Sequence, residues 1–369
     1  MRVPKDLAFS WEAKLVRFLG VSPAMAAPIV SALVAATYFV PGYAFGLLPI
    51  QLDLRDSSIP LDPYSWAAIV TSLLAGFTVF ALPYAQVRHL GDITSLAEIT
   101  PSLDRSGLRD LYVRSSAGDK SGRLIASALG WCFGLLIPIF SVPGAWTVMS
   151  GQPSTWDTDL PPSAYWAAGW FLIIVPFLIA SLSKASYQMV TGARRLLTET
   201  VARLEVGPLD ADRLRPLVNA GLHTSFIWMI GAAIGVLFVL DANIDATVIL
   251  IFMACIAILG GLAAITPAMA GRQVIRRSKD KALAEVRAVI AHLHLDALDA
   301  ASETKVRQAD DQRLAQMGAL LAYEDRLEKA PETPISAPTV AQFALYLAIP
   351  VSSWLGGAFV ERMVDAALG

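Results

Sequence analysis

Residues 27–50 read APIVSALVAATYFVPGYAFGLLPI and contain no Asp, Glu, Lys or Arg. A bilayer core about 30 Å thick needs roughly 20 apolar residues in a helix, and in lipid the backbone polar groups must be paired within that helix. The stretch therefore predicts a membrane-spanning α-helix. Five further uncharged stretches meet the same requirement: Tyr64–Tyr84, Leu124–Met149, Ser163–Ser183, Thr224–Leu240 and Ala246–Gly271.

The composition of the whole chain agrees with this interpretation. The chain is 55% apolar and 16% charged, whereas soluble domains have about 45–50% apolar and about 25% charged residues. We predict an all-α fold, a polytopic transmembrane helical bundle with helical loops on its cytoplasmic side. A seventh candidate span, Val340–Val360, is also uncharged but carries Pro350, Gly356 and Gly357. A crossing is favoured over a re-entrant hairpin there.

The distribution of Lys and Arg predicts the orientation. All of the 29 Lys and Arg residues except Arg55 and Arg362 lie in four segments: the N-terminus, the loops after spans two and four, and the chain after span six. An excess of these residues stays in the cytoplasm. The loops after spans one, three and five are short and acidic, so we place them in the periplasm and the N-terminus in the cytoplasm. Arg outnumbers Lys, as is common in high-GC bacteria, which indicates a bacterial inner membrane.

The chain divides into four parts. Residues 1–26 are predicted to form an interfacial helix, because Glu12, Lys14 and Arg17 interrupt what would be the apolar core of a cleaved signal peptide. Residues 27–271 hold the six spans. Residues 272–338 form a cytoplasmic stalk and helical hairpin, in which span six continues as an amphipathic helix before a polar run and a second helix. Residues 339–369 form the C-terminal hydrophobic segment. The apolar stripes of the hairpin are predicted to pack on other loops or on a second subunit.

Several kinds of chemistry are missing from the sequence. The six spans contain no ionisable side chain of the kind that marks proton relays, and no HExxH, GxxxxGK[ST] or GxSxG motif is present. Cys132 and Cys255 each lie within an apolar run, so we interpret both as packing residues. We therefore predict no cofactor and no catalytic residue. The sequence shows no basic face for a nucleic-acid partner outside the cytoplasmic loops.

One weak set of metal ligands lies on the stalk. His292, Asp296 and Asp299 are spaced i, i+4, i+7 and share one helix face. Such a set has donors for a divalent metal with water completing the shell. An ordinary solvated helix face is the more common origin of this spacing.

Two alternatives to a non-enzymatic role stay open. A secondary transporter would use an uncharged site at the bilayer midplane, with hydroxyls such as those of Thr37, Tyr38 and Tyr43. A membrane enzyme acting on lipid headgroups at the cytoplasmic face would use His89, Asp92 and His223 as acid–base groups. In the sequence these three residues lie in or beside the loops near Gln86–Gly122 and Lys184–His223. Their more common role is as interfacial residues.

The last third of the chain resembles a group of uncharacterised bacterial inner-membrane proteins. The resemblance rests on AYEDRLE at 322–328, on FALYLAIPVSSWLGGAFVERMVD at 343–365 and on the passage through Pro267 into a basic helix. It implies no activity and transfers no site residue. Taken together, the sequence favours a non-enzymatic membrane protein that is channel-like or belongs to a larger complex. Its expected partners are the lipid bilayer and either further copies of itself or another membrane protein, which the cytoplasmic helices would contact.

Overall fold

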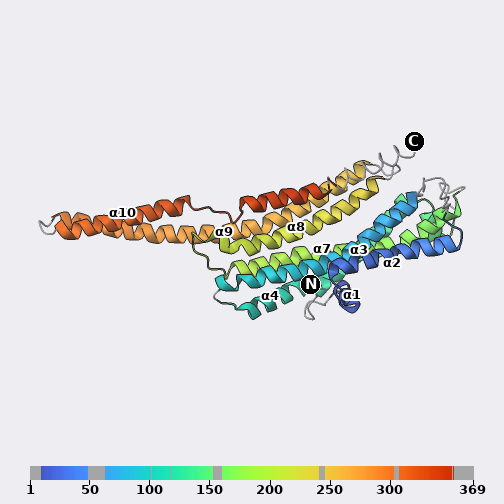
Figure 1. Ribbon diagram of the computed structural model, residues 1–369, viewed down its shortest axis with the longest axis horizontal. Coiled ribbons are helices and arrows are strands. Elements are labelled where there is room, and N and C mark those ends of the chain that lie inside the picture. Colours follow the sequence, from blue (N-terminus) through green and yellow to red (C-terminus); the bar gives the residue numbers. More distant parts are fainter. Residues whose placement is uncertain are drawn as a thin grey trace.

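The computed structural model describes residues 10–48, 63–100, 102–117, 119–152, 160–240, 246–302, 307–350 and 352. All the regular secondary structure within these ranges is helical, so the predicted all-α class is confirmed. The helices form an elongated bundle, and one helical pair projects from it (Figure 1). We call the end from which this pair projects the hairpin end.

The helices are named in chain order. Their bounds are α1 Trp11–Leu19, α2 Pro23–Ala44, α3 Pro63–Thr94, η2 Ser95–Ile99, α4 Arg105–Ala117, α5 Lys120–Ser141, α6 Ala145–Ser150, α7 Pro162–Val201, η3 Ala211–Leu214, α8 Arg215–Val236, η4 Leu237–Leu240, α9 Ala246–Ser302 and α10 Arg307–Lys329. A shorter apolar helix, Ala337–Pro350, follows α10.

Five stretches of helix among the described residues are long and apolar enough to cross a membrane, which is typical of a multi-pass membrane protein. They are Pro23–Ala44, Tyr64–Ile99, Lys120–Ser141, Pro162–Val201 and Ala211–Val236. Large apolar side chains on these helices face outward, as lipid contact requires; Val40, Phe133 and Phe177 are each more than 60% exposed. The predicted span Ala246–Gly271 lies within α9, although the side chains at its start lie outside the described residues, and the predicted span Val340–Val360 extends beyond the described residues.

Several helices continue beyond the predicted spans. The sequence predicts loops near 86–122 and 184–223, but α3 runs on to Thr94, α7 to Val201, and α8 begins at Arg215. α3 and α7 continue past the ends of their apolar runs, and α8 begins before its own. Backbone hydrogen bonds sustain a helix through polar sequence once its apolar face is packed. These extensions meet at the hairpin end (Figure 1).

The largest helix interfaces join α2 with α3, α5 with α7, and α8 with α9, the pairs that each short acidic loop connects. Small residues allow the closest of these approaches. A Cβ atom added at Gly134 of α5 would lie 2.7 Å from the Pro176 Cα atom of α7, so only glycine fits there.

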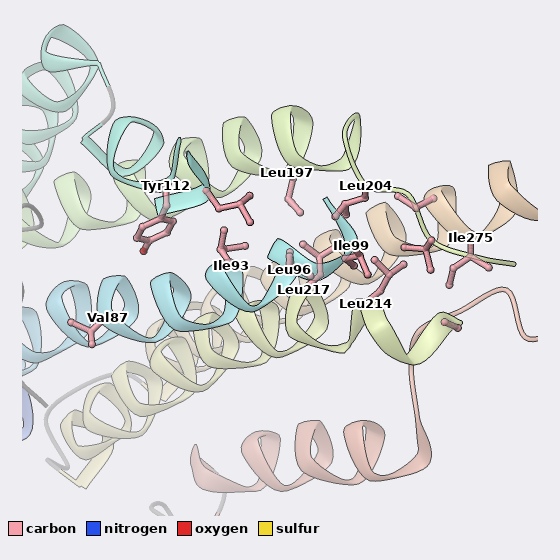
Figure 2. Close-up of a cluster of buried hydrophobic side chains, with 14 of the residues drawn as sticks. Val87, Ile93, Leu96, Ile99, Tyr112, Leu197, Leu204, Leu214, Leu217 and Ile275 are labelled. Atoms are coloured by element: carbon pink, nitrogen blue, oxygen red, sulfur yellow. The ribbon is translucent and has the colours of Figure 1, made fainter. Parts of the chain in front are cut away.

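The main buried cluster lies at the hairpin end and joins the extended parts of the helices. Leu96 and Ile99 of η2 meet Leu214 of η3 and Leu217 of α8. Ile275 of α9 lies beside them (Figure 2). A second, aromatic cluster around Tyr38 lies between α2 and α7. The extended helix ends are therefore a packed core rather than loose loops.

The projecting pair is formed by α9 and α10. α9 runs without a break from the bundle to Ser302, and α10 packs back along it (Figure 1). Arg287 binds both Glu324 at 2.6 Å and Glu328 at 2.7 Å. Lys279 is 7% exposed, and its Nζ donates to the Glu328 carbonyl at 2.7 Å, which caps the end of α10.

α1 begins at a Ser10 cap, whose side chain accepts from the Ala13 amide, and ends at Gly20 with a φ of 69°. The helix buries Glu12, which forms an ion pair of 2.7 Å with Lys184 of α7. α1 lies within the segment predicted as an interfacial helix, and this ion pair fixes it to the bundle.

Candidate polar pocket at the hairpin end of the bundle

Helices α3, α4, α7, α8 and α9 surround a pocket of about 430 Å³. Most of its wall is apolar, with Leu82, Ile93, Met189, Leu217 and Trp228 among the lining residues. Pockets of about 300–1,000 Å³ with apolar walls and a few placed polar groups are the usual form of small-molecule sites. The polar groups of this pocket therefore decide what it can bind.

A hydrogen-bonded pair of side chains joins α3 and α8 behind the pocket wall. The Nδ1 atom of His223 lies 2.8 Å from the Oδ2 atom of Asp92, and the two side chains are 22% and 17% exposed. When Nδ1 carries the proton and donates it to the carboxylate, Nε2 is left as a hydrogen-bond acceptor. The carboxylate thus orients the imidazole in the manner of a general base.

A second histidine faces the pocket itself. The Nε2 atom of His89 lies 2.9 Å from the Thr224 hydroxyl. That hydroxyl is also 3.1 Å from the Ala220 carbonyl. If the threonine donates its single hydrogen to this carbonyl, it accepts the hydrogen bond from His89.

Helix geometry explains how the two contacts arise together. His89 and Asp92 are three residues apart on α3 and share a face. His223 and Thr224 are consecutive on α8 and therefore point about 100° apart. One α8 residue thus meets Asp92 while its neighbour meets His89.

Tyr112 of α4 also lines the pocket. Its ring is 4% exposed, and burial raises the pKa of the phenol above its ordinary value, with the charge of Asp92 adding to the increase and the Ser116 hydroxyl opposing it. The phenol therefore stays protonated at neutral pH and keeps its hydrogen for donation.

Two carboxamides are the least satisfied polar groups of the pocket. Gln86 of α3 and Gln188 of α7 are 3% and 4% exposed. Neither the Oε1 atom of Gln86 nor the Oε1 and Nε2 atoms of Gln188 has a hydrogen-bond partner among the described residues. Burying a polar group without a partner costs about 1–3 kcal/mol, so such groups are rare unless something else binds them.

The structure brings together the three residues of the predicted acid–base set. The interpretation of these residues as interfacial side chains rather than catalysts is not tested by this arrangement. They lie within one polar cluster because α3 and α8 extend as helices beyond the predicted spans.

The predicted transporter hydroxyls do not form a shared site. Thr37 donates to the Val34 carbonyl at 2.6 Å and accepts from the Trp170 indole at 2.9 Å. Tyr38 is fully buried in the aromatic cluster, whereas Tyr43 is 65% exposed. Thr37 and Tyr38 pack α2 against α7.

The weak metal set is not tested by the geometry. His292 is exposed on α9, and the side chains of Asp296 and Asp299 lie outside the described residues. Among the described residues, no group of three or more His, Cys, Asp or Glu side chains is placed to hold a metal ion. Cys132 is exposed on α5, so it does not lie in the packed interior of this chain. The side chain of Cys255 lies outside the described residues.

Sequence reasoning missed Gln86, Gln188, Tyr112 and Thr224. A search for ionisable residues passes over neutral amides and hydroxyls. The available signal was a single carboxamide shortly after each of two apolar runs: Gln86 follows Tyr84 by two residues, and Gln188 follows Ser183 by five.

Comparisons with known proteins add no identity. The chain matches no family model, and no curated protein and no solved structure matches it.

Proposed function

We propose that this protein is a seven-span component of a bacterial inner membrane that binds a small ligand in the α3–α7–α8–α9 pocket. In this proposal the protein is not an enzyme, and the α9–α10 hairpin couples ligand binding to a cytoplasmic partner or to a second copy of the chain. The observation that carries the proposal is the pair of buried, unpartnered carboxamides, Gln86 and Gln188, in the wall of a pocket of drug-like size.

The orientation rests on charge. The basic segments of the chain are the ones that meet at the hairpin end, and an excess of Lys and Arg marks the cytoplasmic side. Helix Ala337–Pro350 supports the seventh span, because Tyr346 packs against Phe226 of α8 with ring centroids 4.9 Å apart. The membership in the uncharacterised group that the last third resembles stays part of this proposal.

α9 supports the coupling between the pocket and the hairpin. Leu262 and Pro267 of α9 line the pocket, and the same helix continues into the hairpin. Pro267 lies inside the helix and removes one backbone hydrogen bond, which is the usual cause of a bend. A change in how the pocket is filled can therefore alter the direction in which the hairpin projects.

A membrane enzyme acting on lipid headgroups is the second candidate. It is favoured by the hydrogen-bonded His223–Asp92 pair, which has the form of an oriented general base. Loss of a measured turnover in Asp92→Asn, in protein that retains its fold, would favour the enzyme over the binding protein.

Native mass spectrometry of the protein released gently from membranes tests the main proposal. We expect a bound small molecule of reproducible mass on the wild type. The adduct should be lost from the Gln86→Leu, Gln188→Leu double variant, because Leu keeps the side-chain size and removes both carboxamides. Gln273→Leu, on the exposed surface of α9, is the matched control and should keep the adduct. An adduct that persists in the double variant, or none on the wild type, would contradict the proposal.

A further inference from the structure

The pocket has an open side between α7 and α9. Val190 of α7 and Leu262 of α9 both line the pocket, yet they are 57% and 55% exposed. Thr266 of α9 and Arg194 of α7 are lining residues that are also exposed. We call these four residues the mouth of the pocket.

The mouth lies at the level of the inner headgroups, an assignment that rests on the proposed orientation. Val190 lies about 10 Å along the helix beyond Ser183, where the apolar run of α7 ends. Leu262 lies nine residues, about 13 Å along the helix, before Gly271, where the apolar run of α9 ends. The mouth therefore spans the boundary between acyl chains, at Leu262, and headgroups, near Val190, and the exposed apolar side chains of both residues suit an acyl chain.

The polar groups lie deep in the pocket rather than at the mouth. Gln86 and Gln188 are nearly fully buried. His89, which pairs with Thr224 of α8, lies one turn after Gln86 on α3. A ligand that satisfies these carboxamides must have its polar part inside and its apolar part toward the mouth. It must also donate hydrogen bonds to two amide oxygens and accept one from an amide NH₂ group.

Charge restricts the polar part further. Arg194 is the only lining residue among those described that carries a permanent charge, and it lies at the exposed mouth. A buried anionic head would have no cation beside the carboxamides, and burying an unpaired charge is far more costly than burying a hydroxyl. Hydroxyl groups both donate and accept, so an uncharged polyol matches the two carboxamides.

Volume restricts the apolar part. A cavity of about 430 Å³ is near the lower end of the range for small-molecule sites. It has room for a small head and the first part of one chain, but not for the two chains of a phospholipid. The rest of a single chain would lie in the mouth, in contact with Val190 and Leu262.

We infer that the pocket binds a single-chain lipid with an uncharged, hydroxyl-bearing head, the class of the monoacylglycerols, and that this lipid enters sideways from the inner leaflet between α7 and α9. The inference deepens the proposed function by naming the class of ligand and its route.

Photolabelling in phosphatidylcholine nanodiscs tests this inference. The probe is a monoacylglycerol with a diazirine in its acyl chain. We expect saturable labelling of the wild type, on α7 near Val190 and on α9 near Leu262. Unlabelled monoacylglycerol should compete. Glycerol, which lacks the chain, and a lysophosphatidic acid with the same chain, which has an anionic head, should not.

Variants test separately the contacts to the lipid head and the opening of the mouth. Gln86→Leu with Gln188→Leu should reduce labelling about tenfold, because two hydrogen bonds to the head are lost. Val190→Trp should reduce it similarly by filling the mouth. Ile173→Trp, at a position 61% exposed elsewhere on α7, is the matched control and should label like the wild type. Thermal unfolding of each variant shows that the fold is retained.

The outcomes distinguish this inference from the proposed function. Equal labelling in the double variant, equal competition by lysophosphatidic acid, or labelling that does not saturate would overturn the lipid inference. If native mass spectrometry still shows a carboxamide-dependent adduct of another mass, the binding function stands and only the ligand class is wrong. If there is neither adduct nor saturable labelling, both fail.

Discussion

His223 and Asp92 are 131 positions apart in the sequence, and their Nδ1 and Oδ2 atoms lie 2.8 Å apart between α8 and α3. The contact forms where both helices have left their predicted apolar spans. It joins α3 to α8 behind the wall of the pocket, so its strength affects both the stability of the fold and the shape of the pocket.

A double-mutant cycle on His223→Ala and Asp92→Asn should give a coupling energy of about 1–3 kcal/mol, because the pair is largely buried and one partner is charged. The measurement is the free energy of unfolding in mixed detergent micelles. Arg276 and Asp280 on α9 are the matched control pair. They are 3.9 Å apart and 68% and 70% exposed, so their coupling should be at most about 0.5 kcal/mol. Additive effects at the His223–Asp92 pair would contradict the contact.

Gly134→Ala should destabilise the α5–α7 interface by about 1–3 kcal/mol, since its Cβ atom would meet the backbone of Pro176 at 2.7 Å. Gly91→Ala on α3 is the control. A Cβ atom there meets nothing within 4 Å, and alanine favours a helix over glycine by up to about 1 kcal/mol. The two substitutions should therefore shift the thermal unfolding midpoint in opposite directions, and a shift in the same direction would argue against the packing described.

Lys279→Met should loosen the end of α10. The substitution keeps an apolar chain of similar length but removes the Nζ donor to the Glu328 carbonyl. We expect the loss of a charged donor to this partly buried carbonyl to cost about 1–3 kcal/mol. Hydrogen exchange of the backbone at 328–336 reports it as faster exchange. Lys281→Met, at an exposed position of the same helix, should leave exchange unchanged.

The junction between α10 and the last helix should weaken at low pH. The hydrogen bond from Arg272 and the charge of Lys279 hold the pKa of Glu332 below its ordinary value of 4.5. A carboxyl whose pKa is lower in the folded state stabilises that state above its ordinary pKa, and the contribution is lost as pH falls through the lower, folded value. The protection of the backbone amides at 328–336, which is their exchange rate relative to the intrinsic rate at the same pH, should therefore fall as the pH drops below about 4.5. Glu332→Gln should remove this fall in protection, and an unchanged pH profile in that variant would contradict the assignment.

Reporter fusions test the orientation that the proposed function requires. Because Lys and Arg stay in the cytoplasm, we expect three fusion sites on each side of the membrane: Ser57, Ser154 and Asn243 in the periplasm, and Ser106, Glu205 and Ala301 in the cytoplasm. If two or more of the six report the opposite side, the predicted spans are wrong.

The sequence by itself determined the helical class and the positions of the apolar runs. In lipid a backbone must pair its own polar groups, so uncharged runs of about 20 residues leave helix as the form that a segment can adopt alone. The 3,4 spacing after Arg272 likewise predicted that span six continues as a stalk, and α9 does so. These are local properties, which a sequence records directly.

Only the tertiary structure decided the pocket. The apolar runs end near Tyr84 and Ser183, whereas α3 and α7 continue because their extended faces pack on η2, α4 and α8. That packing depends on contacts between distant residues, for which a single sequence gives no signal. The packing also buries the neutral side chains of Gln86 and Gln188. The same amides on an exposed helix face would bind water and would not indicate a ligand site.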